Sequence, residues 1–356
     1  MSTSTLAPAH SPEERAGAAR TGVARANTTR LLWLVASLAV LALVTAASLM
    51  IGSKDIPIDT VIASLLGREQ GSVSEIVMEQ RLPRTLLGLV VGAALGIAGA
   101  LIQAFTRNPL ADPGILGVNA GASFFVVLGV GFLGLYTIQS YLWLAFLGAF
   151  VATAVVYTIG SLGRGGATPV RLTLAGVALG AVLGGISSAV TLLNPGAFDR
   201  LRFWGAGSLM NRSMDVVVTV LPFILIGLLI AIACTRSLNA VALGDDLARS
   251  LGSRIGLTRV GVIASVTLLS GAATAAAGPI GFVGLMIPHI ARWIVGPDQR
   301  WIFAYTLTLA PTLLLAADIV GRIVIRPAEL QVGIVTAFIG APVLIWLVRT
   351  TRASGL

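Results

Sequence analysis

Ten long apolar runs follow one another along this chain, and only short polar connections separate them. An α-helix needs about 20 mainly apolar residues to cross the hydrocarbon core of a bilayer, and most of the runs are close to that length. In lipid, a spanning segment has to satisfy its own backbone polar groups, which favours helices. We therefore expect an all-α integral membrane protein with about ten transmembrane helices, at 31–51, 85–105, 115–135, 141–162, 172–193, 214–234, 257–277, 280–295, 301–325 and 331–348.

The composition agrees with a membrane protein and argues against a nucleic-acid-binding one. Of the 356 residues, 56% are hydrophobic and only 11% are charged, well below the roughly 25% typical of soluble domains. The net charge of +9 comes from basic residues that stand singly between apolar runs. They form no basic patch interleaved with aromatic residues, as nucleic-acid binding would require.

The N-terminal segment differs from the rest of the chain. Residues 1–30 are small and polar with evenly spaced arginines, and we expect them to be a disordered cytoplasmic leader. The apolar run that follows is longer than the core of about 7–15 residues found in a signal peptide. We interpret 31–51 as a spanning helix and 31–356 as a single transmembrane domain.

The arginines also predict the orientation. With a cytoplasmic N-terminus and ten helices, 15 of the 24 basic residues fall inside and 9 outside, as the positive-inside rule expects. Both termini are then cytoplasmic.

No residues of the chain form a recognisable catalytic or metal site. Lys54 is the only lysine and follows Ser53, whereas a phosphate-binding loop needs a glycine before its lysine. Cys234 is the only cysteine, and His10 and His289 are too far apart in sequence to suggest a metal site. We expect no enzymatic activity and no cofactor bound by this chain.

Glycines repeat every fourth residue in two of the expected helices. Small residues at this spacing let helices approach closely in lipid. One series is Gly88, Gly92 and Gly96, followed by Ala100, and the other is Gly176, Gly180 and Gly184. We interpret both as packing faces.

The run 280–295 is the shortest, and Gly278-Pro279 precedes it, which predicts a broken or partly re-entrant segment. Gly281, Gly284 and Pro288 are expected to interrupt it further. His289 has two open interpretations, a proton-sensitive residue or a structural hydrogen-bonding one.

Long runs of this chain resemble the FecCD-type permeases, the membrane subunits of ABC importers for iron-siderophores, haem and cobalamin. They cover nearly all of the chain beyond residue 80. The runs are "RLPRTLLGLVVGAALGIAGALIQAFTRNPLADPGILGVNAGA", "LTLAGVALG", "ALGDDLARSLG", "GPIGFVGLMIPHIAR", "LLLAADIVGR" and "ELQVGIVTAFIGAPVLIWLV".

The resemblance implies a type II ABC importer permease fold in the bacterial cytoplasmic membrane. It also implies three kinds of partner: an ABC ATPase dimer that binds ATP and Mg²⁺, an extracytoplasmic substrate-binding protein, and a second permease subunit, identical or related. Ferric siderophore is the expected cargo, with haem or cobalamin as the alternative.

Three arginines match the family positions that dock the binding protein, namely Arg81, Arg84 and Arg322. The predicted topology also places them outside, where a guanidinium can bind a partner's carboxylate. The other interpretation is that they anchor helix ends at the membrane interface.

The run "ALGDDLARSLG" matches the segment that contacts the ATPase. Locally, Gly244 is expected to end one element and Asp245 or Asp246 to cap a short helix. Ala248, Leu251 and Gly252 suit a compact contact face. Asp245, Asp246 and Arg249 can equally be ordinary solvated charges.

The family lines its transport route largely with its fifth helix, here 172–193. The candidate lining residues are Ser187, Ser188, Thr191 and Asn194. Interhelical hydrogen bonding is the alternative role for each.

The competing class is an ion-coupled secondary transporter, which needs ionisable groups near the middle of the membrane. Asp318 is the best candidate. Since Arg322 lies four residues on, we expect local pairing on one helix face instead. A membrane enzyme or scaffold is the third class, and no nucleophile–base arrangement supports it.

Overall fold

The computed structural model describes residues 27–52, 55–162 and 168–352, and within these ranges the chain is helical without strands. Each of the ten expected spans coincides with a helix. These helices are α2 (Asn27–Met50), α5 (Leu82–Thr106), α6 (Val118–Leu133), α7 (Ile138–Ser161), α8 (Pro169–Leu193), α10 (Met214–Val241), α12 (Ile255–Ala277), α13 (Val283–Val295), α14 (Gln299–Val324) and α15 (Val332–Arg352).

Seven of the helical segments in the described part of the chain are long and apolar enough to cross a membrane, and α6, α13 and α15 are shorter. The number of crossings and the side of each terminus therefore stay predictions. Helix α2 begins at Asn27, four residues before the expected start, and residues 1–26 of the expected leader lie outside the described residues.

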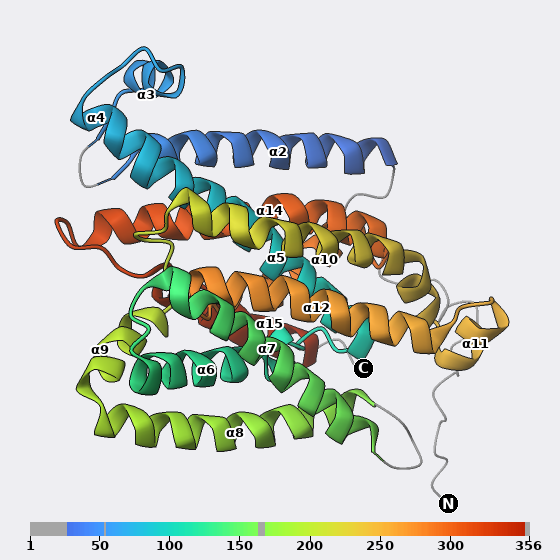
Figure 1. Cartoon of the computed structure of the whole chain (residues 1–356). Helices are drawn as coiled ribbons and strands as arrows, with labels where there is room; N and C mark the ends of the chain where they lie inside the picture. Colours follow the sequence, from blue (N-terminus) through green and yellow to red (C-terminus); the bar gives the residue numbers. More distant parts are fainter. Residues whose placement is uncertain (1–26, 53–54, 163–167, 353–356) are drawn as a thin grey trace, which may run out of the picture.

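The helices form a bundle with α5 near its centre (Figure 1). Helix α5 packs against α14, α12, α13 and α10, and most of its side chains are buried. Helices α2 and α8 lie at opposite edges of the bundle and expose most of their apolar side chains. Since a membrane helix needs no aqueous face, these exposed sides suit lipid or another apolar partner.

Short elements occupy the two ends of the bundle (Figure 1). At one end, α3 (Ile58–Leu65) and α4 (Ser72–Glu75) lead through the π-helical turn η1 (Ile76–Arg81) into α5, and α9 (Pro195–Trp204) follows α8. At the opposite end lies α11 (Asp245–Ser250). We call these the Arg84 end and the α11 end.

The first glycine series packs as predicted, and the second does so only in part. A Cβ added to Gly88, Gly92 or Gly96 would lie 2.5–2.6 Å from an atom of α14. In the second series, a Cβ on Gly176 would meet the Ile115 carbonyl oxygen at 1.8 Å, whereas a Cβ on Gly184 would meet no described atom of another element within 4 Å. Within this chain, α8 therefore packs closely at Gly176 but not at Gly184.

The sequence "TRNPLADPG" turns the chain between α5 and α6 through the 3₁₀ turn η2 (Pro113–Leu116). Arg107 ends α5 in the left-handed conformation, at φ 53°. Asp112 Oδ1 accepts a hydrogen bond of 2.7 Å from the Gly114 amide. Burial raises the pKa of the Asp112 carboxyl above its ordinary value, and this backbone hydrogen bond opposes the shift.

The break before α13 is confirmed and includes Gly281, but Gly284 and Pro288 do not interrupt the helix as expected. Gly278 adopts φ 75°, Phe282 adopts φ 69°, and α13 then runs unbroken through Pro288. Proline lacks the amide that would bind the Gly284 carbonyl in a helix. Gln103 of α5 lies at that position, since its Nε2 is 3.4 Å from the Gly284 oxygen and donates at 2.9 Å to the Leu285 oxygen.

Candidate functional site

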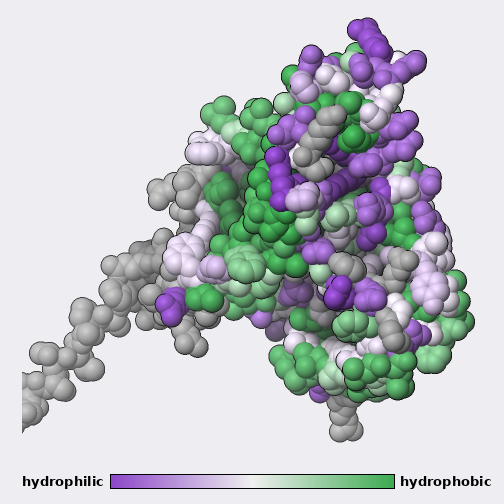
Figure 2. All heavy atoms as spheres, turned by 90° about the vertical axis from the view of Figure 1, so that its left-hand side faces the viewer, coloured by the Kyte–Doolittle hydropathy of each residue, from purple (hydrophilic) through white to green (hydrophobic). Residues whose placement is uncertain are grey.

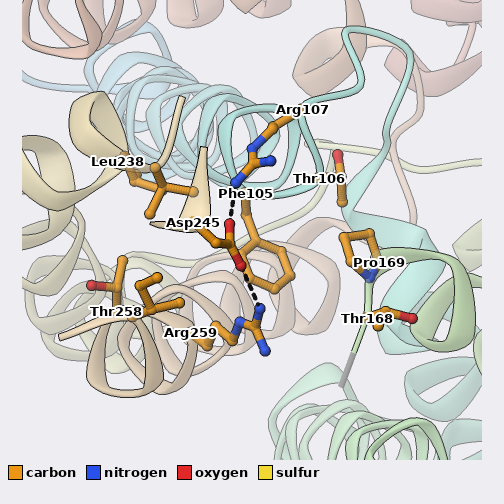
Figure 3. A pocket seen from close by; sticks show the side chains of 11 residues that line it. Phe105, Thr106, Arg107, Thr168, Pro169, Leu238, Asp245, Thr258 and Arg259 are labelled. Atoms are coloured by element: carbon orange, nitrogen blue, oxygen red, sulfur yellow. Dashed lines mark hydrogen bonds and ion pairs between the residues drawn. The ribbon is translucent and has the colours of Figure 1, made fainter. Parts of the chain in front are cut away.

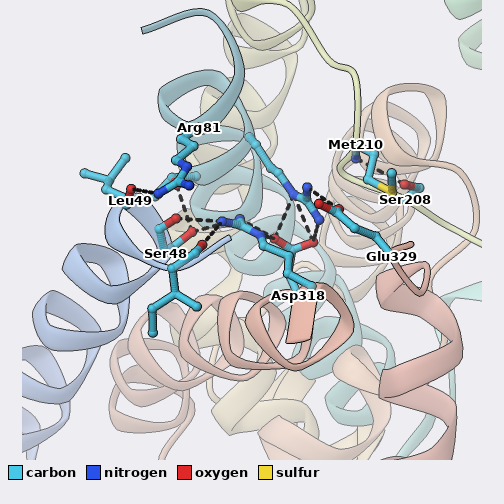
Figure 4. Close-up of polar contacts among 11 residues, drawn as sticks. Ser48, Leu49, Arg81, Ser208, Met210, Asp318 and Glu329 are labelled. Carbon is cyan, nitrogen blue, oxygen red and sulfur yellow. Dashed lines mark hydrogen bonds and ion pairs between the residues drawn. The ribbon is translucent and has the colours of Figure 1, made fainter. Parts of the chain in front are cut away.

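The structure brings the three predicted docking arginines together with two acidic residues at the Arg84 end (Figure 4). We call this group the outer polar cluster; its members are Arg81, Arg84, Asp318, Arg322 and Glu329. They come from η1, α5, α14 and the loop between α14 and α15, so segments more than 230 residues apart in sequence meet here.

Arg84 binds both acidic residues of the cluster. Its Nε donates to Asp318 Oδ2 at 2.9 Å and its Nη2 to Asp318 Oδ1 at 2.8 Å, which is a two-pronged guanidinium–carboxylate pair. The remaining nitrogen, Nη1, donates to Glu329 Oε2 at 2.7 Å. Sequence analysis missed Glu329, because nothing in its local pattern indicates a partner on α5.

Asp318 also binds Arg322, one helical turn further along α14. Arg322 Nε donates to Asp318 Oδ2 at 3.0 Å, which confirms the local pairing expected from their spacing. Asp318 is therefore held between two guanidiniums and is 1% exposed. A carboxylate so engaged is poorly suited to bind a transported ion.

The other nitrogens of the cluster bind backbone carbonyls where α2 ends. Arg322 Nη1 donates to the carbonyls of Ser48 and Ile51, and Arg81 Nη1 donates to those of Leu49 and Met50. The last carbonyls of a helix have no partner within that helix, so the two guanidiniums satisfy them. Gly52 provides the room, since a Cβ there would lie 2.7 Å from Arg81 Nη2.

The cluster arginines are more enclosed than exposed docking groups would be. Arg81 is 6% exposed and Arg322 is 2% exposed. Arg84 retains 11% side-chain exposure and Glu329 retains 17%. Figure 2 looks onto this end of the molecule, where hydrophilic residues gather between apolar surfaces.

At the α11 end, Asp245 links three elements (Figure 3). Its Oδ1 accepts from Arg107 at the end of α5, and its Oδ2 accepts from Arg259 of α12 at 3.1 Å. The expected capping role is wrong, since Gly244 is the N-cap at φ 112° and no side chain caps α11. Arg107 and Arg259 were missed, because they are 138 and 14 residues away in sequence.

The other predicted residues of this segment differ in exposure. Ala248 is buried against Val241 and Ile255, so it lies on the inner side of α11 and does not belong to an exposed contact face. Leu251 is 62% exposed. Asp246 is almost fully exposed and pairs only locally with Arg249, at 2.7 Å, as a solvated charge does. Gly252 adopts φ 80° after the helix.

Two further exposed leucines precede Leu251 at intervals of four residues. Leu243 is 62% exposed and Leu247 is 49% exposed, and the three lie four residues apart. They give the segment an apolar edge that the sequence analysis did not single out. A cavity of about 220 Å³ lies at the same end of the bundle, lined by Phe105, Arg107, Asp245, Thr258 and Arg259 among others.

His289 is buried near the middle of α13. Among the described residues, neither ring nitrogen has a hydrogen-bond partner, and the ring packs in a T-shaped arrangement with Trp293, with 5.0 Å between the ring centroids. The expected structural hydrogen bond is therefore not seen in this conformation.

Similarity to known proteins identifies the family of this chain. The model of the FecCD transport family matches residues 38–350. The chain belongs to the FecCD transport family. It is 51% identical to the ferric enterobactin transport system permease protein FepD of Escherichia coli, over 92% of this chain and 98% of that protein. It is 39% identical to the Fe(3+)-citrate import system permease protein YfmD of Bacillus subtilis, over 92% and 97%.

A solved structure has the same fold. It is a metal-chelate type ABC transporter in an inward-facing conformation, 27% identical in sequence, with a TM-score of 0.77 over 89% of this chain and 98% of the other. The FecCD-family chain is thus a membrane permease, a transport subunit, and the part of it that the structure describes is all-helical.

In this FecCD-family chain, the predicted lining residues lie near the C-terminal end of α8, where Ser188 is exposed and Ser187, Thr191 and Asn194 are half-buried. Ser188 Oγ donates to the Gly184 carbonyl and Thr191 Oγ1 to the Ser187 carbonyl, both at 2.9 Å and both within α8. Asn194 Nδ2 donates to the Gly131 carbonyl of α6 at 3.0 Å, which is an interhelical bond. A lining role for these residues stays a prediction.

Proposed function

We propose that this chain is the permease subunit of a binding-protein-dependent ABC importer and that its cargo is a ferric siderophore. It gives the cargo access to alternate sides of the membrane, and partner ATPases supply the energy. The observation that carries the proposal is the position of two distinct polar sites at opposite ends of one helix bundle, in a chain 51% identical to a ferric enterobactin permease.

The Arg84 end is the docking site for the substrate-binding protein in this proposal. It offers the outer polar cluster, whose arginines prefer carboxylate partners with two-pronged geometry. The chain binds no cofactor itself, and ATP and Mg²⁺ reside on the partner.

The α11 end is the site for the ATPase dimer. The exposed leucines Leu243, Leu247 and Leu251 supply an apolar edge for a groove on the ATPase, and the solvated Asp246 and Arg249 flank them. Apolar side chains at the centre and charges at the rim are the usual anatomy of a protein interface.

A second permease subunit, identical or related, covers α8. This helix exposes Leu174, Val177 and Val182. Ser187, Ser188, Thr191 and Asn194 then lie where two such helices enclose a route.

The test is transport in proteoliposomes that contain this chain with the ATPase and binding protein encoded beside it. Radiolabelled ferric siderophore is supplied with ATP, and an ATPase variant that cannot hydrolyse ATP is the control. Uptake that needs both ATP hydrolysis and the binding protein is the expected result.

Two other outcomes would change the proposal. ATP-dependent uptake of haem with no uptake of siderophore would change the proposed cargo and keep the importer mechanism. Haem is tested because the chain is 34% identical to the hemin transport system permease protein HmuU of Yersinia pestis. Uptake that follows an imposed proton or sodium gradient without ATP would favour the ion-coupled class instead.

A further inference from the structure

The two acidic partners of Arg84 differ in their exposure to an approaching molecule. Asp318 is 1% exposed, lies within α14 and binds Arg322 as well. Glu329 is 17% exposed and lies in the short loop between α14 and α15. Of the two, Glu329 is the one that an approaching molecule can reach.

The backbone around Glu329 is fixed, so its side chain can rotate without unfolding the loop. The amide of the next residue, Leu330, donates to the Gly321 carbonyl at 2.9 Å. A Cβ on Gly321 would meet the Leu330 carbonyl oxygen at 2.6 Å, which shows how closely loop and helix pack. A change of rotamer can therefore release Glu329 from Arg84 while this backbone hydrogen bond is kept.

Charge also favours a carboxylate as the incoming group. When Glu329 leaves, Arg84 and Arg322 share the single carboxylate of Asp318. Both carboxylate oxygens of Asp318 already accept hydrogen bonds from Arg84 or Arg322. Arg84 Nη1 is the guanidinium nitrogen that does not bind Asp318, and it is the one that Glu329 occupies.

We propose that Glu329 is an intramolecular substitute for an acidic side chain of the docking protein. On docking, a carboxylate of that protein takes the place of Glu329 at Arg84 Nη1, while Arg84 keeps its two hydrogen bonds to Asp318. This inference rests on the proposed function, since it names the group through which the binding protein engages. An exchange of one carboxylate for another gains little net energy, which suits a complex that has to release in every transport cycle.

Neutralising the substitute tests this exchange. Glu329→Gln keeps the size of the side chain but leaves a weaker, uncharged acceptor at Arg84, so the incoming carboxylate meets less competition. We expect the Kd of the cargo-loaded binding protein to fall roughly fivefold, the value for an ion pair of about 1 kcal/mol.

Asp55→Asn is the matched control. Asp55 lies at the same end of the molecule and pairs with Arg326 at 3.1 Å, but it is 69% exposed and does not contact Arg84. This change alters the net charge of the surface by the same amount. Any tighter binding by Glu329→Gln beyond that of Asp55→Asn therefore reports local competition, not general attraction.

The measurement is biolayer interferometry of the loaded binding protein on the whole transporter in nanodiscs, with wild type and both variants. Thermal unfolding of each variant checks that it folds. Glu329→Asp is the second variant; it keeps the charge but withdraws it from Arg84, and we expect a smaller gain than for Glu329→Gln.

Tighter docking by Glu329→Gln than by Asp55→Asn would support the exchange. Equal or weaker docking would overturn it and leave Glu329 with a purely structural role, while wild-type docking would still support the importer. Failure of the wild type to bind any such protein would contradict the proposed function and this inference together.

Discussion

At the scale of single residues, the arginines of the outer polar cluster illustrate what a sequence motif conveys. The motif indicates which end of the protein they occupy and that they lie close together. It does not indicate that Arg84 binds Glu329, because 245 residues separate them. Partners of this kind come from tertiary packing, and a single sequence carries no local signal for them.

Asp318 is the residue on which the cluster depends most. Asp318→Asn removes the charge that faces Arg84 and Arg322 and leaves two enclosed guanidiniums with a neutral partner. Breaking a buried ion pair typically costs about 3–5 kcal/mol, so we expect a clear fall in the thermal unfolding temperature in detergent. Asp55→Asn breaks a more exposed pair and should cost about 0–1 kcal/mol. Equal stability of the two variants would contradict a structural role for the cluster.

Gly99 supplies a second residue-scale prediction. A Cβ there would lie 1.8 Å from the carbonyl oxygen of Gly284, so Gly99→Ala forces α5 away from α13. We expect destabilisation of about 1–3 kcal/mol or more. Gly256→Ala in α12 meets open space and should be neutral or slightly stabilising, since alanine favours helix. Thermal unfolding of the two variants side by side checks this, and a stable Gly99→Ala protein would argue against the close approach.

At the scale of elements, the positions of the helices were predictable and their environments only partly so. Helix positions follow from the lengths of apolar runs, which the membrane dictates. The every-fourth-residue spacing predicts close contact where a neighbour exists, as at Gly92, but it does not say whether one exists, as Gly184 shows. Pro288 was expected to break α13 because local rules leave a carbonyl unpaired there, whereas Gln103 of another helix binds at that point.

The link between α11 and the bundle leads to a prediction about coupling. Asp245 joins α11 to α5 and α12, so in the proposed importer a movement of α11 would reach both helices through these contacts. Asp245→Asn weakens two partly exposed ion pairs of about 1 kcal/mol or less each. We expect roughly a fivefold fall in cargo transported per ATP hydrolysed, with the ATPase still active.

Asp246→Asn is the comparison variant, since it removes the same charge from the same short helix and from the proposed ATPase contact, whereas Asp246 pairs with Arg249 of α11 and leaves the link from Asp245 to α5 and α12 intact. The ratio of transported cargo to released phosphate in proteoliposomes measures the effect. Equal ratios for the two variants would show that the Asp245 contacts do not transmit movement.

At the scale of the whole molecule, the remaining prediction is which end faces the cytoplasm. The structure places α11 and the Arg84 end on opposite sides of the bundle, so one measurement fixes both. The distribution of arginines predicts that α11 is inside. Arg68 beside α3 and Leu251 beside α11 are both exposed, which makes them suitable labelling positions.

Cysteine labelling distinguishes the two orientations. In a Cys234→Ala background, the Arg68→Cys variant should react with a membrane-impermeant maleimide added to intact spheroplasts. The Leu251→Cys variant should react only after the membrane is opened, because its side chain is then on the cytoplasmic side. The reverse pattern would show that the protein has the opposite orientation, with the outer polar cluster facing the inside of the cell. It would then remove the basis for docking at Arg84. Since every partner proposed for this chain approaches from a definite side, this orientation decides which end each of them can reach.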